Sequence, residues 1–525
     1  MTETRGTRLR KPLVIALGAA LYALLYGFCS QIDRTGHADM MEAGRRFLIA
    51  LPAALAVLTG LFAGVLPFLE KKLKAGRKSE KPFCTIGAFA LIFLCYVPMF
   101  LIEFPGSFTY NTQDQTVQAA SGMYTTFHPL IHTLLLKACL STYDFFQSYE
   151  KCAALYSIIQ MLVLSGCFAL ICASLSRSTT RRVAHLAMIF FCLYPTHWVL
   201  ASNCTKDVLF SGFFALFLAY ALEAVRAGKL PAGRIAMQAA GMMACLFRNN
   251  MIYAMAAWLV LLIIWQARRH IQLIVCTALA IVLAVFANSG LKAATHAADG
   301  KIVEMLSVPI QQLAYARLTA DERFTDEERE LMDSVFVDAC YSHYEPTLSD
   351  PVKDRVDDAA MREHMGEMAK LWLSVGLKCP NEYLDAFLNL TLPSLYPYRE
   401  YGVIAPYLEA GANGGVITEI FGQPPIVQPA RFAGIREFLT EQFFDTGADH
   451  VPVVRELFNT GSVFWLLLLL FLNSLYRGDG KHTLVLFLPV LLWGTFLLGP
   501  VMQGRYLYPF ICSLPMFAAC AKEEN

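Results

Sequence analysis

Charged residues are scarce in this sequence. Lys, Arg, Asp and Glu together make up 16% of its 525 residues, whereas apolar residues make up 56%. Ordinary soluble domains are about one-quarter charged, because a surface in contact with water needs polar side chains. This composition excludes a soluble globular protein and favours a chain whose surface faces lipid.

Three further features are missing. The net charge is only +1, so the total charge predicts no nucleic-acid partner. No CxxC or Cys/His metal spacing occurs, so we expect no cofactor, and a divalent metal has no support in the sequence. No segment repeats with a fixed period, which argues against a solenoid. Cys340 and Cys379 alone lie in the large polar region, where one disulfide and two free thiols both remain open.

Long apolar stretches are abundant instead. A hydrocarbon core about 30 Å thick needs roughly 20 helical residues to cross it. The first stretch lacks a small-residue cleavage site, so we interpret it as a membrane span and not as a signal peptide. We therefore expect an all-α polytopic membrane protein with about twelve transmembrane helices, near residues 12–31, 47–69, 83–102, 151–175, 183–201, 207–225, 232–248, 250–267, 271–290, 461–476, 482–500 and 505–521.

Basic residues predict the orientation of these spans. Lys and Arg in short loops favour the cytoplasmic side. All basic loops share one side only if residues 128–147 do not cross the membrane, so we expect a helix at the outer interface there. Both termini are then cytoplasmic, and the pair Arg45–Arg46 is the one discordant feature. The basic loops are 1–11, 71–81, 177–182, 226–234, 268–269 and 477–481.

This topology divides the chain into four parts. Within the third part, Asp321 to Phe336 predicts an amphipathic helix with an acidic face, while Thr391 to Tyr401 and Gly411 to Pro425 predict loops. The parts are 1–82, an N-terminal two-helix membrane segment with a basic cytoplasmic loop; 83–290, a membrane core with a first extracytoplasmic loop at 103–150; 291–460, an inserted extracytoplasmic domain of mixed helix and loop; and 461–525, a C-terminal three-helix membrane segment.

Polar residues gather at the expected outer ends of the spans. Such residues are costly near lipid and often mark function. Carboxylates suit general-base catalysis and cations suit phosphate binding, so Asp114 and Asp207 are the catalytic candidates. The substrate-binding candidates are Asn111, Gln115, His128, His132, Lys206, Arg248, Asn249, Arg505 and Tyr506.

Each of these residues also has an ordinary structural role open to it. Lys206 and Arg505 can extend to the interface from a helix end. Tyr506 can belong to the aromatic belt, and Asn249 can cap a helix. Asp114 can be a solvated loop carboxylate. The prediction of a site therefore depends on the clustering of these residues and on no single member.

Short motifs occur at the same outer ends. They are Phe104-Pro105-Gly106, Asn111-Thr112-Gln113-Asp114-Gln115, His128-Pro129-Leu130-Ile131-His132-Thr133, Lys206-Asp207, Phe247-Arg248-Asn249-Asn250, Pro309-Ile310-Gln311-Gln312, and Gly499-Pro500-Val501 with Arg505-Tyr506. From about residue 83 onward, the chain resembles a family of uncharacterised bacterial polytopic membrane proteins. That family in turn looks like the GT-C type glycosyltransferases, which take a sugar from a polyprenyl-phosphate carrier.

The resemblance implies a GT-C-like fold and location in the bacterial plasma membrane. It also implies a function: transfer of a sugar from a polyprenyl-phosphate carrier to a cell-envelope acceptor on the outer face. A first-loop Asp would act on the acceptor hydroxyl, and Arg and Lys would hold the carrier phosphate. In this sequence Asn111 occupies the position where relatives place that Asp. Asp114 taking the role, Asp207 supplying the acid group, and an inactive chain all remain open.

Other functions remain open as well. A transporter or flippase of a lipid-linked or amphipathic substrate often contains broken helices, and the short segment 232–248 fits that description. A polymerase or ligase of surface polysaccharide also combines many spans with one large outer loop. The sequence gives neither the sugar nor the acceptor.

Overall fold

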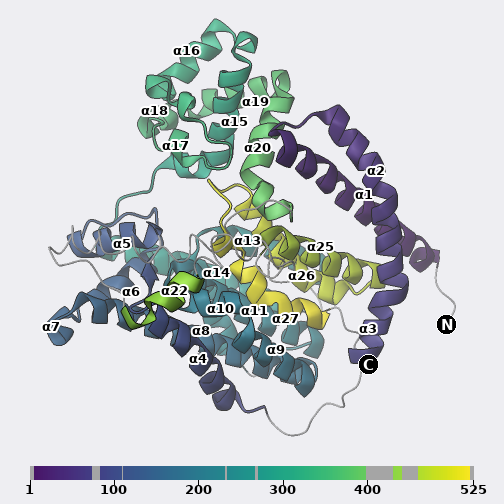
Figure 1. Cartoon of the computed structure of the whole chain (residues 1–525), viewed down its shortest axis with the longest axis vertical. Helices are drawn as coiled ribbons and strands as arrows, with labels where there is room; N and C mark the ends of the chain where they lie inside the picture. The colour runs from purple at the N-terminus through teal and green to yellow at the C-terminus, as the bar shows by residue number, and fades with distance from the viewer. Residues whose placement is uncertain are drawn as a thin grey trace.

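The chain folds almost entirely into helices. The computed structural model describes residues 5–73, 83–108, 110–230, 233–266, 270–397, 430–439 and 459–520. In this part of the chain, the strands are β1 (Ser107–Phe108) and β2 (Asn203–Cys204). Figure 1 shows a bundle of long helices from which a smaller group of helices projects. The predicted all-α class is confirmed.

All twelve predicted spans coincide with helices, but only some of these helices are long enough to cross a membrane. A seventh candidate is the pair α9 (Arg181–Leu193) and α10 (Pro195–Ala201), which is bent by 58°. Helices α12 (Arg234–Phe247), α13 (Asn250–Gln266), α25 (Thr460–Arg477), α26 (Gly480–Phe496) and α27 (Tyr508–Cys520) are shorter. The six long candidates are α1 (Arg5–Thr35), α2 (Met40–Gly60) continued by η1 (Leu61–Val65) and α3 (Leu66–Leu73), α4 (Thr85–Ile102), α8 (Tyr149–Ser178), α11 (Lys206–Ala227) and α14 (Ile271–Thr295).

Helix α11 lies at the centre of the bundle. Thr205 caps its first turn by accepting a hydrogen bond from the Asp207 N–H, and Gly228 ends it with a left-handed φ of 69°. Its sequence is apolar on every side, as expected of a helix enclosed by protein, and it packs against α8, α12 and α27. In the most apolar stretch of α11, 94% of the residues are buried. In the most apolar stretch of α2, η1 and α3 only 11% are buried, so the apolar side chains there are available to contact lipid.

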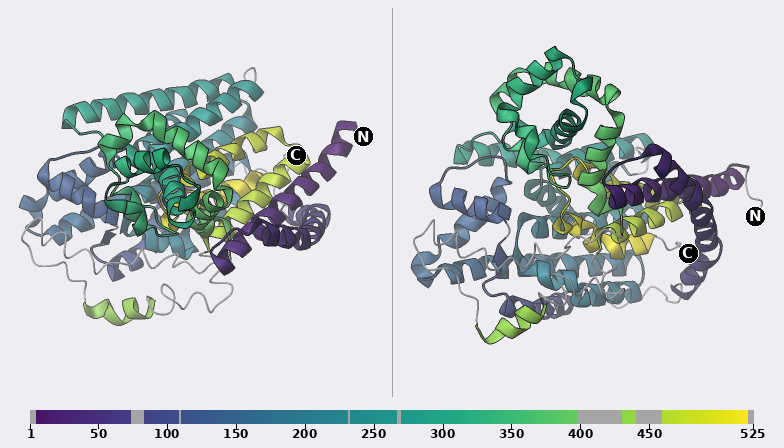
Figure 2. Two further views of the ribbon diagram at one scale, coloured as in Figure 1. Left: turned by 90° about the horizontal axis from the view of Figure 1, so that it is seen from above. Right: turned by 45° about the horizontal axis from the view of Figure 1, so that its top comes forward.

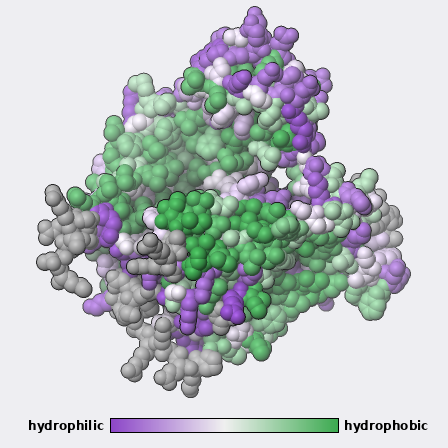
Figure 3. All heavy atoms as spheres, turned by 180° about the vertical axis from the view of Figure 1, so that it is seen from behind, coloured by the Kyte–Doolittle hydropathy of each residue, from purple (hydrophilic) through white to green (hydrophobic). Residues whose placement is uncertain are grey.

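The surface divides in the same way. The bundle presents mostly hydrophobic side chains, whereas the projecting helices are mostly hydrophilic (Figure 3). Exposed apolar side chains include Leu48 and Ile49 on α2 and Phe286 on α14. Large apolar surfaces of this kind are stable in lipid and not in water. The structure therefore supports a multi-pass membrane protein.

The projecting helices form a unit with its own hydrophobic core, which runs from Val303 to Tyr383. Seen from above, this unit lies over the bundle (Figure 2). Its elements are η2 (Ile302–Leu306), α15 (Ser307–Thr319), η3 (Asp321–Arg323), α16 (Asp326–Val335), η4 (Val337–His343), α17 (Asp350–Lys353), α18 (Asp358–Glu363), α19 (Met365–Lys378) and α20 (Pro380–Leu395).

Predictions within this unit had mixed outcomes. The amphipathic helix expected from Asp321 to Phe336 is confirmed over Asp326–Val335, which form α16, whereas Asp321–Arg323 form the separate 3-10 helix η3. The loop expected from Thr391 is wrong as far as Leu395, because α20 continues and packs Leu392 against Cys29 and Ile32 of α1. Residues 411–425 lie outside the described residues. All fifteen cysteines are free thiols, so the disulfide alternative fails.

Two N-terminal and interface predictions can also be compared with the structure. Residues 128–147 form only α6 (Leu130–Leu140) and α7 (Tyr143–Phe146), which are too short to span a membrane. The discordant Arg45 and Arg46 both form ion pairs with Glu42 in the first turns of α2.

The first loop is fixed to the segment that precedes α11. Strands β1 and β2 pair in parallel, with Ser107 opposite Asn203. At the preceding turn Gly106 has a φ of 116°. A Cβ on this residue would collide with the Ser157 hydroxyl of α8 and lie 2.8 Å from the Ser202 carbonyl oxygen. The turn therefore requires glycine both for its backbone conformation and for the close approach.

We expect Gly106→Ala to lower the free energy of unfolding by roughly 2–4 kcal/mol, since it adds both backbone strain and overpacking. Denaturation by SDS in mixed micelles measures this change. Gly366→Ala in α19 is the matched control, because a Cβ there meets no atom within 4 Å. Equal stability of the two variants would contradict the proposed role of the turn.

Candidate functional site

Asp114 and Lys206 meet through a buried histidine. Asp114 lies on α5 (Tyr110–Ser121), and its side chain is 46% exposed. The His128 ring, which is 2% exposed, places Nε2 3.8 Å from the Asp114 carboxylate. On the other side of the ring, Lys206 Nζ lies 3.1 Å from His128 Nδ1. The first loop and the start of α11 are thereby joined by three side chains in a row.

The chemistry of this row determines the histidine tautomer. A lysine ammonium group can only donate hydrogen bonds, so His128 Nδ1 is the acceptor. The ring proton then lies on Nε2, which faces Asp114. Burial, and after it the positive charge of Lys206, lowers the pKa of His128 from 6.5 to about 4, although Asp114 acts in the opposite direction. His128 is therefore neutral at pH 7 and directs an N–H at the carboxylate.

Asp207 has a different environment. Its side chain is 1% exposed and contacts Arg248 Nη1, while Arg505 Nε lies 3.6 Å away. The Arg248 guanidinium lies 4.3 Å from the ring centre of Phe496 and 4.5 Å from that of Tyr506. A carboxylate enclosed by two guanidinium groups is held as their counter-ion. Asp207 therefore organises the cations and is not available as a base.

The two clusters are adjacent because Lys206 and Asp207 are consecutive residues at the start of α11. Lys206, Arg248 and Arg505 lie beside two carboxylates, those of Asp207 and Asp114, so three positive charges are close to two negative charges. The N-terminus of a helix adds partial positive charge at the same place. This net positive environment favours an anion such as a phosphate.

A second network lies behind the first loop. Gln115 Oε1 lies 2.7 Å from His132 Nδ1, and His132 Nε2 lies 2.6 Å from the Tyr156 hydroxyl of α8. Gln160, one turn further along α8, donates to the Asn203 carbonyl oxygen at 2.8 Å. Burial lowers the pKa of His132 to about 3, so this ring is also neutral. Since Gln115 and His132 are fully buried, we assign them to positioning the loop.

Not every candidate residue joins these clusters. Asn111 on α5 is half-buried, and Asn249 is exposed between α12 and α13. Among the contacts of the described residues, none connects either side chain to Asp114 or Asp207. The structure thus brings together nine of the eleven candidates and leaves these two apart.

Three residues that contact the site, Tyr156, Gln160 and Phe496, are not among those predicted from the sequence. Tyr156 and Gln160 are four residues apart and therefore share one face of α8. Two polar side chains at this spacing inside an apolar stretch were the available signal. Phe496 carried no signal, because an aromatic residue in an apolar helix is ordinary.

The projecting unit borders the site at two places. The Ala298 N–H donates to the Tyr124 carbonyl oxygen at 2.9 Å, and the Gly300 N–H donates to Thr126 Oγ1 at 3.0 Å. On the other side, the Ser349 N–H donates to the Pro500 carbonyl oxygen at 2.9 Å. The two bundle segments that accept these bonds lead directly into the site. Tyr124 and Thr126 precede His128 by a few residues, and Pro500 precedes Arg505.

Metal ligands do not gather at this place. In the described ranges, no group of three or more His, Cys, Asp or Glu side chains could hold a metal ion.

Asp207→Asn should lower the free energy of unfolding by about 3–5 kcal/mol, because it leaves two buried guanidinium groups without their counter-ion. SDS denaturation of the purified protein measures the loss. Asp299→Asn removes an exposed carboxylate that pairs with Lys292, so it should leave the free energy of unfolding nearly unchanged. Similar costs for both substitutions would refute the role assigned to Asp207.

The lowered pKa of His128 predicts a pH effect on stability. Between pH 6.5 and 4 the unfolded chain binds a proton that the folded ring does not, so lowering the pH destabilises the wild type by up to about 1.4 kcal/mol per unit. His128→Gln removes this loss. The stability advantage of the wild type over the variant should therefore shrink by about 1.6 kcal/mol from pH 6.5 to pH 5. A pH-independent difference in SDS denaturation would show that His128 titrates normally.

Comparison with known proteins identifies a family. No curated protein and no solved structure matches the chain. The sequence model of DUF6020, a family of unknown function, matches residues 117–524. The match covers more than three-quarters of the chain and includes His128, Lys206, Asp207, Arg248 and Arg505, while Asp114 lies just before it. The chain therefore belongs to the DUF6020 family of unknown function.

Proposed function

We propose that this protein is a membrane glycosyltransferase that moves a sugar from a polyprenyl-phosphate carrier to a cell-envelope acceptor. The observation that carries the proposal is the placement of a half-exposed carboxylate, Asp114, close to the half-buried Lys206 and Arg248 and the buried Arg505. Sugar transfer from a lipid phosphate needs these two elements together: a base for the acceptor and positive charge for the leaving phosphate.

The proposed reaction assigns the base to Asp114. Its carboxylate takes the proton from an acceptor hydroxyl, and the acceptor oxygen forms a bond with the anomeric carbon of the sugar. The bond between that carbon and the carrier phosphate breaks, and its electron pair stays on the phosphate. The Nε2–H of His128 faces the carboxylate and orients it, a role that leaves the histidine neutral throughout.

The leaving phosphate gains negative charge as the bond breaks. In the proposed reaction Lys206, Arg248 and Arg505 stabilise this charge, and Asp207 holds the two arginines in place. Preorganised cations in a site with little water stabilise such charge strongly. The rings of Phe496 and Tyr506 hold the Arg248 guanidinium in place.

The proposal also includes a topology. The shorter helices α12, α13, α25, α26 and α27 complete twelve crossings of a bacterial plasma membrane. Both termini are then cytoplasmic, and residues 291–460 with the site are extracytoplasmic. The expected partners are the lipid bilayer, the lipid-linked sugar and an envelope glycan, lipid or protein. The proposed reaction uses no cofactor.

Asp114→Asn should reduce sugar transfer about 10²-fold or more, because an amide cannot accept the proton. The assay incubates the purified protein with a panel of polyprenyl-phosphate sugars and an envelope extract, and measures the release of free polyprenyl phosphate. Asp144→Asn, which changes an exposed carboxylate on α7, is the matched control and should retain full activity.

A second variant distinguishes the remaining possibilities. Asn111→Asp restores the carboxylate that the resemblance expects at that position. Turnover that appears only in this variant would contradict the role of Asp114 and indicate that the natural chain binds without catalysis. If neither the wild type nor any folded variant releases polyprenyl phosphate in the presence of extract, the result would favour a transporter over a transferase.

A further inference from the structure

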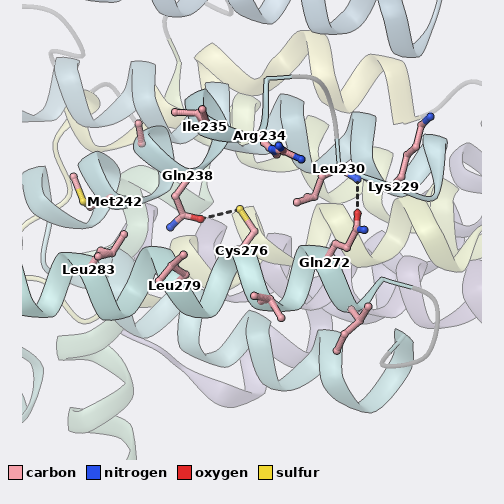
Figure 4. Close-up of a pocket in the computed structure, with 13 residues that line it drawn as sticks. Lys229, Leu230, Arg234, Ile235, Gln238, Met242, Gln272, Cys276, Leu279 and Leu283 are labelled. Carbon is pink, nitrogen blue, oxygen red and sulfur yellow. Dashed lines mark hydrogen bonds between the residues drawn. The ribbon is translucent and has the colours of Figure 1, made fainter.

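An open groove of about 890 Å³ lies between α12 and α14, away from the candidate site. Its walls are mostly apolar, and its floor is fixed by a contact between Gln238 of α12 and Cys276 of α14 at 3.0 Å. Figure 4 shows Lys229 and Gln272 toward one end of the groove and Met242 and Leu283 toward the other. The apolar walls include Ile235, Ala239, Met242, Val275, Leu279 and Leu283.

Two exposed cations, Lys229 and Arg234, line the polar end of the groove. Helices α12 and α14 both begin at this end, so their N-terminal partial charges add to those of the two side chains. The Leu230 N–H donates to Gln272 Oε1 at 3.2 Å and holds Leu230 against α14. The groove therefore combines a positive end with an apolar channel.

The positive end lies across the bundle from the candidate site. Helix α11 begins at Lys206 in the site and ends at Ala227, two residues before Lys229. Its 22 residues span about 33 Å, which is close to the thickness of the hydrocarbon core. The groove and the site thus face opposite leaflets, and a ligand of the groove does not take part in the chemistry at Asp114.

The dimensions of the groove fit a lipid chain. Along α14 its lining extends from Ile271 to Leu283, a length of about 18 Å at 1.5 Å per residue. An extended acyl chain of ordinary length occupies a channel of this size. Basic residues at the end of a membrane helix attract anionic headgroups. A neutral apolar ligand would make no use of the positive charge of Lys229 and Arg234 at the end of the groove.

We propose that this groove binds an anionic phospholipid from the leaflet opposite the candidate site. The headgroup phosphate would contact Lys229 and Arg234, and one acyl chain would lie between α12 and α14. This inference is independent of the proposed sugar transfer, because it depends on different residues at the other end of α11.

The test uses native mass spectrometry of the full chain, equilibrated with micelles that contain either dioleoyl phosphatidylglycerol or dioleoyl phosphatidylcholine. The wild type should retain phosphatidylglycerol over phosphatidylcholine roughly tenfold or more. The double variant Lys229→Gln/Arg234→Gln should lose this preference. Ala239→Trp fills the groove without changing its charge, and it should lower phosphatidylglycerol retention to a similar extent. Lys301→Gln/Lys370→Gln removes two exposed cations elsewhere and should leave retention unchanged.

Three outcomes would overturn the proposal. Loss of retention in the charge variant but not in Ala239→Trp would mean surface attraction without occupancy of the groove. An equal loss in the Lys301→Gln/Lys370→Gln control would mean non-specific attraction by charge. Displacement of the lipid by millimolar inorganic phosphate would mean that the cations bind a free anion. Thermal unfolding of every variant, measured in the same detergent, establishes that each one is folded.

Discussion

The site depends on the ion cluster around Asp207. This carboxylate lies at the buried start of α11, and its two guanidinium partners come from the end of α12 and from η9 (Gly504–Leu507). Charges removed from water are tolerated only when they are paired, so these three segments cannot separate without a large cost. The same pairing positions Lys206, and through it His128 and the first loop.

The two candidate carboxylates, Asp207 and Asp114, have the same functional group but different surroundings, and we therefore assign them different roles. Asp207 is enclosed and neutralised by arginine, whereas Asp114 is half exposed and faces a neutral histidine. The first can only hold cations in place, and the second can reach a substrate. Residue type alone does not separate them, because the difference lies entirely in burial and neighbours.

Helix α11 connects the two proposed sites. Its N-terminus carries Lys206 and Asp207, and its C-terminus leads through Gly228 to Lys229. Because this helix is surrounded by protein along its length, it holds the two ends of the bundle at a fixed separation. The projecting unit, hydrogen-bonded to the segments before His128 and Arg505, borders only one of these ends.

The sequence by itself determined the helical class, the multi-pass membrane character and the position of each apolar helix, because these follow from local apolar length and composition. The sequence also predicted that these nine candidate residues cluster, since the predicted topology places the outer helix ends on one side. Tertiary structure alone decided that Asp207 is neutralised, that Tyr156 and Gln160 support the loop, and that α20 continues to Leu395. Each of these outcomes depends on contacts between segments far apart in the chain, and no local pattern encodes which partner a buried side chain meets.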